Sequence, residues 1–192
     1  GLLHLITCCP DSELLNISKT NLEETENFAA HFESSFILTT ENTAPLEDMF
    51  QYLRTIRTSW LLMQWIEEEK EDMMCDQFNV GPGDIYRQVE SAQWLLVAAG
   101  QVAHLLHQKS LTFDLENLRR RIQYGIKEEL LALVKLRNVG RVRARSLFKH
   151  NVKTFENLKF ISEEDLASIP TIGKALAKDM INQLSEKSLI KA

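Results

Sequence analysis

The sequence predicts an all-α protein, a helical bundle around one long central helix followed by a small unit of two similar helical hairpins. Its 192 residues are 44% hydrophobic, which is enough for a buried core. Only 7 glycines and 4 prolines interrupt the chain, and the apolar residues recur mostly every three or four positions. This composition and this period favour long helices and argue against a many-stranded sandwich.

The first expected helices supply packing surface. Asn21 is expected to cap a segment whose apolar residues have helical spacing. A longer amphipathic helix is expected after Pro45, with one continuous apolar stripe that comprises Leu46, Met49, Leu53, Ile56, Trp60 and Met63. It runs into the acidic residues 67–72, which we interpret as a solvated face because no histidine or aspartate cluster accompanies them.

The strongest turn signal of the chain, residues 79–83, precedes a long helix that Asp84 is expected to cap and that reaches about Gln108. One face of this helix is apolar. The opposite edge carries, at heptad spacing, Arg87, Trp94, Gln101 and Gln108. Such an edge suits a nucleic-acid strand, with Arg87 on a phosphate and Trp94 stacked on a base. Periodicity alone instead favours a helix buried on all sides, with Trp94 in the core and Arg87 paired with an acid.

No catalytic or metal site is predicted. His104 and His107 have a spacing that can hold a metal ion, but no further ligands are in view. The three cysteines, which are Cys8, Cys9 and Cys75, show no CxxC spacing and are expected to be reduced thiols.

Gly125 is expected to end a further helix and to mark a boundary between two domains, residues 1–125 and 126–192. In the second domain a helix, a short turn and another helix occur twice. A helix expected over residues 128–136 leads into the turn Asn138-Val139-Gly140, and the second turn is Thr171-Ile172-Gly173.

These two turns look like tandem helix-hairpin-helix motifs. In this motif, backbone N–H groups at the start of the second helix and flanking basic side chains bind phosphate without reading sequence. The usual second glycine is replaced by Asn138 and Thr171, and asparagine tolerates a left-handed backbone better than threonine. We therefore expect the first hairpin to contact DNA and the second to be mainly structural.

Basic charge is concentrated in the second half of the chain. The formal net charge is −5, but residues 1–76 carry 15 acidic and 4 basic side chains, whereas residues 77–192 carry 12 acidic and 18 basic ones. Residues 130–155 contain seven basic side chains and no acidic one. This run favours phosphate binding, and the alternative is a solvated helix face that pairs with the acidic N-terminal half. The candidate DNA-binding residues are Arg87, Trp94, Gln101, Asn138, Gly140, Arg141, Arg143, Arg145, Lys149, Gly173 and Lys174.

Five short strings extend this interpretation over nearly the whole chain. They are Gly1-Leu2-Leu3-His4-Leu5-Ile6, Phe78-x-Val80-x-Pro82-Gly83-Asp84-Ile85, Trp94-Leu95, Ile126-x-Glu128-Glu129-Leu130-Leu131-x-Leu133 and Gly140-Arg141-Val142-Arg143-Ala144-Arg145. Together they resemble the C-terminal region of archaeal Ski2-like DNA repair helicases of the Hjm or HelQ type.

The resemblance implies roles for both domains. It implies a ratchet-type bundle whose long helix lines the channel for the translocating strand through an Arg and a Trp seven residues apart, here Arg87 and Trp94. It also implies a terminal helix-hairpin-helix domain that contacts the emerging strand as a brake, with Arg141, Arg143 and Arg145 on phosphates. With the resemblance, exposure of Trp94 becomes the favoured expectation.

As a whole, the chain is then expected to be the single-strand-guiding C-terminal part of an ATP-dependent 3′–5′ DNA helicase that acts in replication fork repair. The sequence contains no GxxxxGK[ST] loop and no DExH box, so the chain alone is not expected to be an enzyme or to bind a cofactor. ATP and Mg²⁺ are expected in the full-length helicase. Expected partners are single-stranded or forked DNA, the helicase motor domains, and replication or repair proteins.

Two other functions stay open. One is an accessory module of a Ski2-like RNA helicase, and the other is a protein-interaction scaffold whose interface is the acidic N-terminal half. No apolar run reaches the roughly 18 residues that span a bilayer, so no membrane partner is expected. We expect an intracellular protein, cytoplasmic in a prokaryote or nuclear in a eukaryote.

Overall fold

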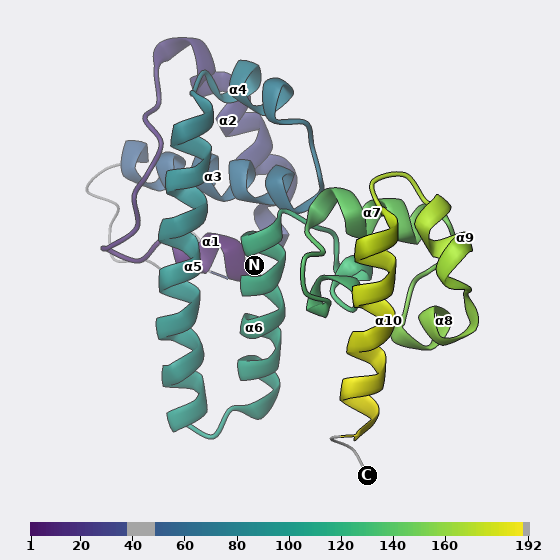
Figure 1. The fold of residues 1–192 in the computed structure, drawn as a ribbon. Helices are drawn as coiled ribbons and strands as arrows, with labels where there is room; N and C mark the ends of the chain where they lie inside the picture. The colour runs from purple at the N-terminus through teal and green to yellow at the C-terminus, as the bar shows by residue number, and fades with distance from the viewer. Residues whose placement is uncertain (38–48, 190–192) are drawn as a thin grey trace. The chain divides into compact units, whose positions relative to one another are not determined.

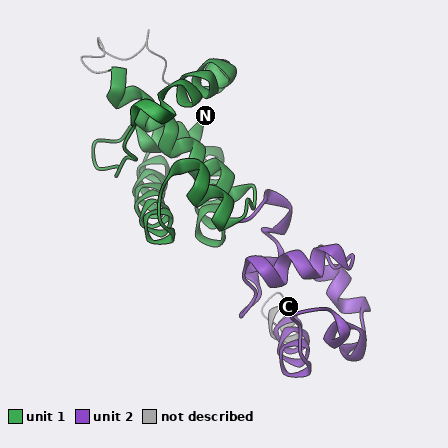
Figure 2. Ribbon diagram, turned by 90° about the horizontal axis from the view of Figure 1, so that it is seen from above, with its two compact units in different colours: residues 1–125 green, residues 126–192 purple. Residues whose placement is uncertain are grey.

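A computed structural model describes residues 1–37 and 49–189, with the backbone alone for residues 185–189 (Figure 1). The described residues form helices, turns and connections and contain no strand, which confirms the predicted all-α class. They divide into two compact units, residues 1–125 and 126–192, which Figure 2 shows in different colours. Pro45, expected near a helix start, lies outside the described residues.

The first unit is a bundle of six α-helices with one short 3₁₀ helix, Glu33–Ser35, among the described residues. The α-helices are α1 (Leu2–Thr7), α2 (Lys19–Phe32), α3 (Met49–Ile66), α4 (Glu71–Phe78), α5 (Pro82–Leu105) and α6 (Lys109–Tyr124). Helix α5 has 24 residues, which at 1.5 Å per residue is about 36 Å. Figure 1 shows α5 and α6 running antiparallel side by side, with α3 crossing behind them. The apolar face of α5 is buried in this bundle.

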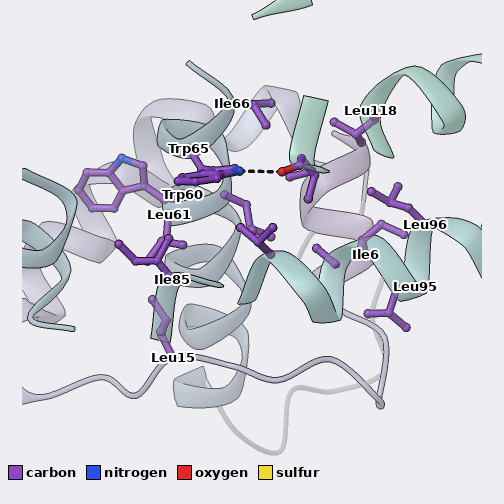
Figure 3. Packing of buried hydrophobic residues seen from close by; sticks show 14 of the residues in the cluster. Ile6, Leu15, Trp60, Leu61, Trp65, Ile66, Ile85, Leu95, Leu96 and Leu118 are labelled. Carbon is purple, nitrogen blue, oxygen red and sulfur yellow. Dashed lines mark hydrogen bonds between the residues drawn. The ribbon is translucent and has the colours of Figure 1, made fainter. Parts of the chain in front are cut away.

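Trp65 on α3 fixes the end of α6 (Figure 3). Its indole Nε1 donates a hydrogen bond to the carbonyl oxygen of Ile122 at 2.7 Å. Gly125 then ends α6 in the left-handed region, with a φ of 60°. A Cβ atom at this position would lie 2.6 Å from the Trp65 ring, so both the backbone angle and the space require glycine.

Two helix starts differ from the sequence prediction by one turn. Helix α5 begins at Pro82, so Asp84 is the third helical residue and not the cap; its carboxylate accepts a hydrogen bond from the Gly81 N–H at 2.9 Å. Likewise α2 begins at Lys19, and the Asn21 side chain accepts a hydrogen bond from the Ser18 N–H. Each side chain thus satisfies the N–H of the residue before the helix, which is one half of a capping box.

The second unit holds the two hairpins. Two 3₁₀ turns, Glu128–Leu130 and Leu133–Lys135, replace the helix predicted over residues 128–136, so that prediction was wrong. Four helices follow, namely α7 (Arg141–Lys149), α8 (Phe155–Phe160), α9 (Glu163–Ser168) and α10 (Lys174–Leu189). Each hairpin buries its apolar residues, among them Leu136 and Val139 in the first and Ile169 and Ile172 in the second.

Candidate nucleic-acid interface

One edge of α5 carries the polar and aromatic residues that the sequence singled out. Arg87, Trp94 and Gln101 are all exposed, and Trp94 keeps 59% of its surface accessible. The alternative of a helix buried on all sides is therefore wrong for Trp94. Gln108 does not belong to this edge, because α5 ends at Leu105 and Gln108 caps α6.

Arg87 is held by two carboxylates. Its guanidinium forms an ion pair with Asp84 one turn earlier on α5, and its Nε lies 3.7 Å from the Glu13 carboxylate. Glu13 belongs to the connection between α1 and α2, residues 8–18, and its N–H donates to the Ser91 hydroxyl on α5 at 3.4 Å. The expectation that an acid pairs with Arg87 is met, although more than half of the Arg87 side chain stays exposed.

The first hairpin presents one arginine to solvent beside its turn. Asn138 adopts a left-handed backbone with a φ of 63°, and Gly140 caps α7. The Arg143 Nη1 donates to the Asn138 carbonyl oxygen at 2.7 Å, so the exposed guanidinium lies next to the start of α7. A cation beside free helix N–H groups suits a phosphate oxygen.

The two neighbouring arginines are less accessible than Arg143. Arg145 forms an ion pair with Glu129 at 2.6 Å and lies 5.2 Å from the centre of the Phe148 ring. Arg141 is half-buried, whereas Lys149 is exposed at the end of α7. Of the three arginines predicted at this hairpin, Arg143 is thus the one whose guanidinium faces solvent most freely.

The second hairpin repeats the backbone of the first. Thr171 has a φ of 73°, in the same left-handed region as Asn138, although a β-branched residue is strained there. Gly173 and Lys174 are exposed at the start of α10. The Ser146 hydroxyl of α7 donates to the Pro170 carbonyl oxygen at 2.6 Å, which ties the two hairpins together. The second hairpin therefore has the backbone of a phosphate-binding turn, but with a single lysine beside it.

Sequence reasoning missed two residues next to Arg87, namely Glu13, which pairs with it, and Gln88, which is buried on the apolar face of α5. Gln88 interrupts the apolar face of α5 between Ile85 and Ala92, and a polar residue on a buried face is a signal that could have found it. No sequence pattern predicts the role of Glu13, because its ion pair with Arg87 joins residues that are 74 positions apart.

The described residues show neither the ligand cluster of a metal site nor a membrane-spanning helix. They contain no group of three histidine, cysteine, aspartate or glutamate side chains that could hold a metal ion. None of their helices is long and apolar enough to cross a membrane.

Comparison with known proteins gives matches for both units. The family described as archaeal helicase, domain 4, matches residues 1–125, and the SAM-like helix-hairpin-helix tandem matches residues 130–186. Among curated proteins, the ATP-dependent DNA helicase Hel308 of Pyrococcus abyssi is 34% identical over 190 residues, which is 97% of this chain and 26% of that protein. Hel308 of Methanocella arvoryzae is 34% identical over 97% of this chain and 25% of its own length.

A third relative, Hel308 of Pyrobaculum calidifontis, is 42% identical over 128 residues, which is 66% of this chain and 18% of that protein. The chain thus spans about a quarter or less of the length of these relatives.

Proposed function

This chain belongs to the archaeal helicase family, whose domain 4 spans residues 1–125, and from that premise we propose that it guides single-stranded DNA. The observation that carries the proposal is the exposed row of Arg87, Trp94 and Gln101 along α5. An exposed indole offers a flat face on which any base can stack, and a cation seven residues away matches a phosphate of the same strand. Gripping of this kind is independent of sequence.

The second unit contributes a phosphate contact in this proposal. Arg143 beside the start of α7 binds the strand backbone, while Gly140 and Asn138 shape the turn that exposes the helix N–H groups. Arg141, Arg145 and Lys149 add positive potential, and Gly173 and Lys174 form a weaker second contact. A grip on the strand in this unit slows its passage, which is the expected action of a brake.

The ATP-hydrolysing motor domains of the helicase are proposed to lie outside these residues. The relatives are named ATP-dependent DNA helicases, and most of their length has no counterpart in this chain. We assign ATP and Mg²⁺ to that remaining part, since this sequence contains no GxxxxGK[ST] loop and no DExH box. Unwinding with 3′–5′ polarity and action at replication forks belong to the same proposal for the whole protein.

Binding of single-stranded DNA by the chain, measured by fluorescence anisotropy, tests the proposal. Trp94→Ala is expected to weaken binding roughly 5- to 100-fold, since stacking on one base contributes about 1–3 kcal/mol. Phe160→Ala is the matched control, because Phe160 is an exposed aromatic residue on α8, a helix that carries none of the proposed contacts. Equal losses in both folded variants would contradict strand guidance by α5.

A second pair of variants tests the hairpin. Arg143→Ala is expected to weaken binding several-fold, whereas Lys159→Ala, which removes an exposed cation from α8, is expected to change it little. Tighter binding of an RNA strand than of a DNA strand with the same sequence would favour the alternative of an RNA helicase module.

A contact with the remainder of the helicase is favoured by one further observation. Large apolar side chains are exposed where α5 ends and α6 begins, namely Val102, Leu105, Leu106, Leu111 and Phe113. Exposed apolar groups gathered at one end of a hairpin are typical of a protein interface. We assign this end to the motor domains, and Leu105→Ser with Phe113→Ser is expected to abolish binding of a separately produced motor part without unfolding the chain.

A further inference from the structure

A cavity of about 360 Å³ opens beside Arg87 in the first unit. Its walls come from three segments: the connection between α1 and α2, the joint between α4 and α5, and the first turns of α5. Leu15, Ile17 and Phe78 supply apolar surface, while Arg87 and Gln88 line it from α5. This volume lies in the range of small-molecule sites, which are about 300–1,000 Å³.

Gln88 is the unusual group in this cavity. Only 6% of its surface is exposed, yet its amide has no hydrogen-bond partner among the residues that the structure describes. The amide atoms keep some contact with solvent in the cavity, so a ligand there would replace water at this amide and would not have to break a protein hydrogen bond. The amide carries two donors and one acceptor, which remain available to a ligand in the cavity.

The charges around the cavity decide which part of a nucleotide fits. Glu13 and Asp84 both line it, so a phosphate inside would face two carboxylates. A neutral base meets no such repulsion and matches the site with its flat apolar faces and its polar edge. The exposed side of the Arg87 guanidinium is available for the phosphate next to that base.

We propose that this cavity holds one nucleobase of the guided strand, with the Gln88 amide hydrogen-bonded to the edge of the base and Arg87 on the adjacent phosphate. The proposal rests on the proposed function, since it supplies the strand. It adds a contact of a different kind, because stacking on Trp94 accepts any base, whereas an amide distinguishes donor and acceptor patterns. A modest base preference at this position follows.

Nuclear magnetic resonance of the chain with amide ¹⁵N labels tests the cavity directly. The probes are the four deoxynucleoside monophosphates, with deoxyribose phosphate and inorganic phosphate as controls that lack a base. The nucleotides are expected to shift the side-chain amide signal of Gln88, and the two controls are not. Gln88→Met, which keeps the length of the side chain, is expected to weaken nucleotide binding about 3- to 10-fold, as one lost hydrogen bond does. Gln123→Met, at an exposed site on α6, is the control substitution.

The possible results test the nucleobase site in the cavity and strand guidance by α5 separately. Equal shifts with deoxyribose phosphate would overturn the base contact and leave an anion site at Arg87. No shift at millimolar nucleotide would overturn the cavity altogether, even if Trp94→Ala still weakens strand binding and so supports guidance. Conversely, nucleotides that occupy the cavity while Trp94→Ala leaves strand binding unchanged would retain the nucleotide site and refute guidance by α5.

Discussion

At the scale of single residues, the candidate interface is defined by the partners of its charged side chains. Arg87 forms ion pairs with Asp84 and Glu13, and Arg145 with Glu129, whereas the exposed Arg143 donates only to the Asn138 carbonyl oxygen among the interactions of the described residues. A phosphate has to compete with the carboxylates at Arg87. In the proposed function, that competition makes the grip on a strand weak and readily reversed.

Glu13→Gln is expected to tighten binding of single-stranded DNA about 2- to 5-fold, because it frees Arg87 from a surface ion pair worth about 0.2–1 kcal/mol. Anisotropy titrations measure the change. Glu23→Gln removes the same charge from an exposed site on α2 and serves as the control. The gain should vanish in an Arg87→Ala background, and a gain that persists there would disprove the link between the two residues.

His4 makes the stability of the first unit depend on pH. Its ring is 1% exposed, its Nε2 lies 3.1 Å from the Thr55 hydroxyl, and burial lowers its pKa to about 4. In the unfolded chain the His4 side chain becomes protonated near pH 6.5, whereas in the folded chain it stays neutral until about pH 4. The contribution of His4 to the free energy of unfolding is therefore present at neutral pH and is lost as the pH falls through this range.

Between pH 7 and 5 this loss is expected to be about 2 kcal/mol, measured by urea unfolding. His4→Gln should flatten the pH dependence, and His150→Gln, at an exposed histidine, should not. A wild-type chain whose stability is the same at both pH values would contradict this account of His4.

At the scale of elements, the left-handed Gly125 marks the end of α6, whereas local rules allow a helix to begin at either of two places. Aspartate and asparagine are favoured both as caps and inside the first turn, so Asp84 and Asn21 were assigned to the wrong one of these positions. Residues 128–136 have a helical apolar pattern, yet they form two 3₁₀ turns that bury Leu130, Leu133 and Val134. Packing against neighbouring helices overrides the pattern in such a short segment.

The two hairpins differ in strain, and a pair of substitutions measures the difference. Thr171→Gly is expected to raise the free energy of unfolding by about 1 kcal/mol, because threonine is strained at a φ of 73°. Asn138→Gly should change it by only a few tenths, since asparagine tolerates this region. Chemical denaturation of the two variants provides the comparison, and equal effects would show that Thr171 is not strained.

At the scale of the whole chain, the net charge conceals the basic run that we propose to bind nucleic acid. The formal charge of −5 describes a protein that repels DNA, while residues 130–155 form a basic run. Ionic contacts and stacking contacts respond differently to salt, so their shares of the binding free energy can be separated.

Affinity for single-stranded DNA is expected to fall with salt, with a slope of about −0.7 on logarithmic axes for each phosphate contact. Arg143→Ala should reduce this slope by about one contact. Trp94→Ala should lower the affinity and leave the slope unchanged, because stacking releases no counterions. A salt-independent affinity would instead favour the protein-interaction scaffold.

The sequence by itself determined the helical class and the tandem hairpins, because each follows from periods and turn residues within a few positions of one another. Exposure of Trp94 on α5 did not follow from periodicity, which favoured its burial, and is seen only in the tertiary structure. Only the tertiary structure decided which arginines are free to meet a phosphate. Glu13 reaches Arg87 across 74 positions, and Glu129 reaches Arg145 across 16. The cavity at Gln88 likewise needs three segments to meet. Such contacts depend on how distant segments pack, and no local pattern records that.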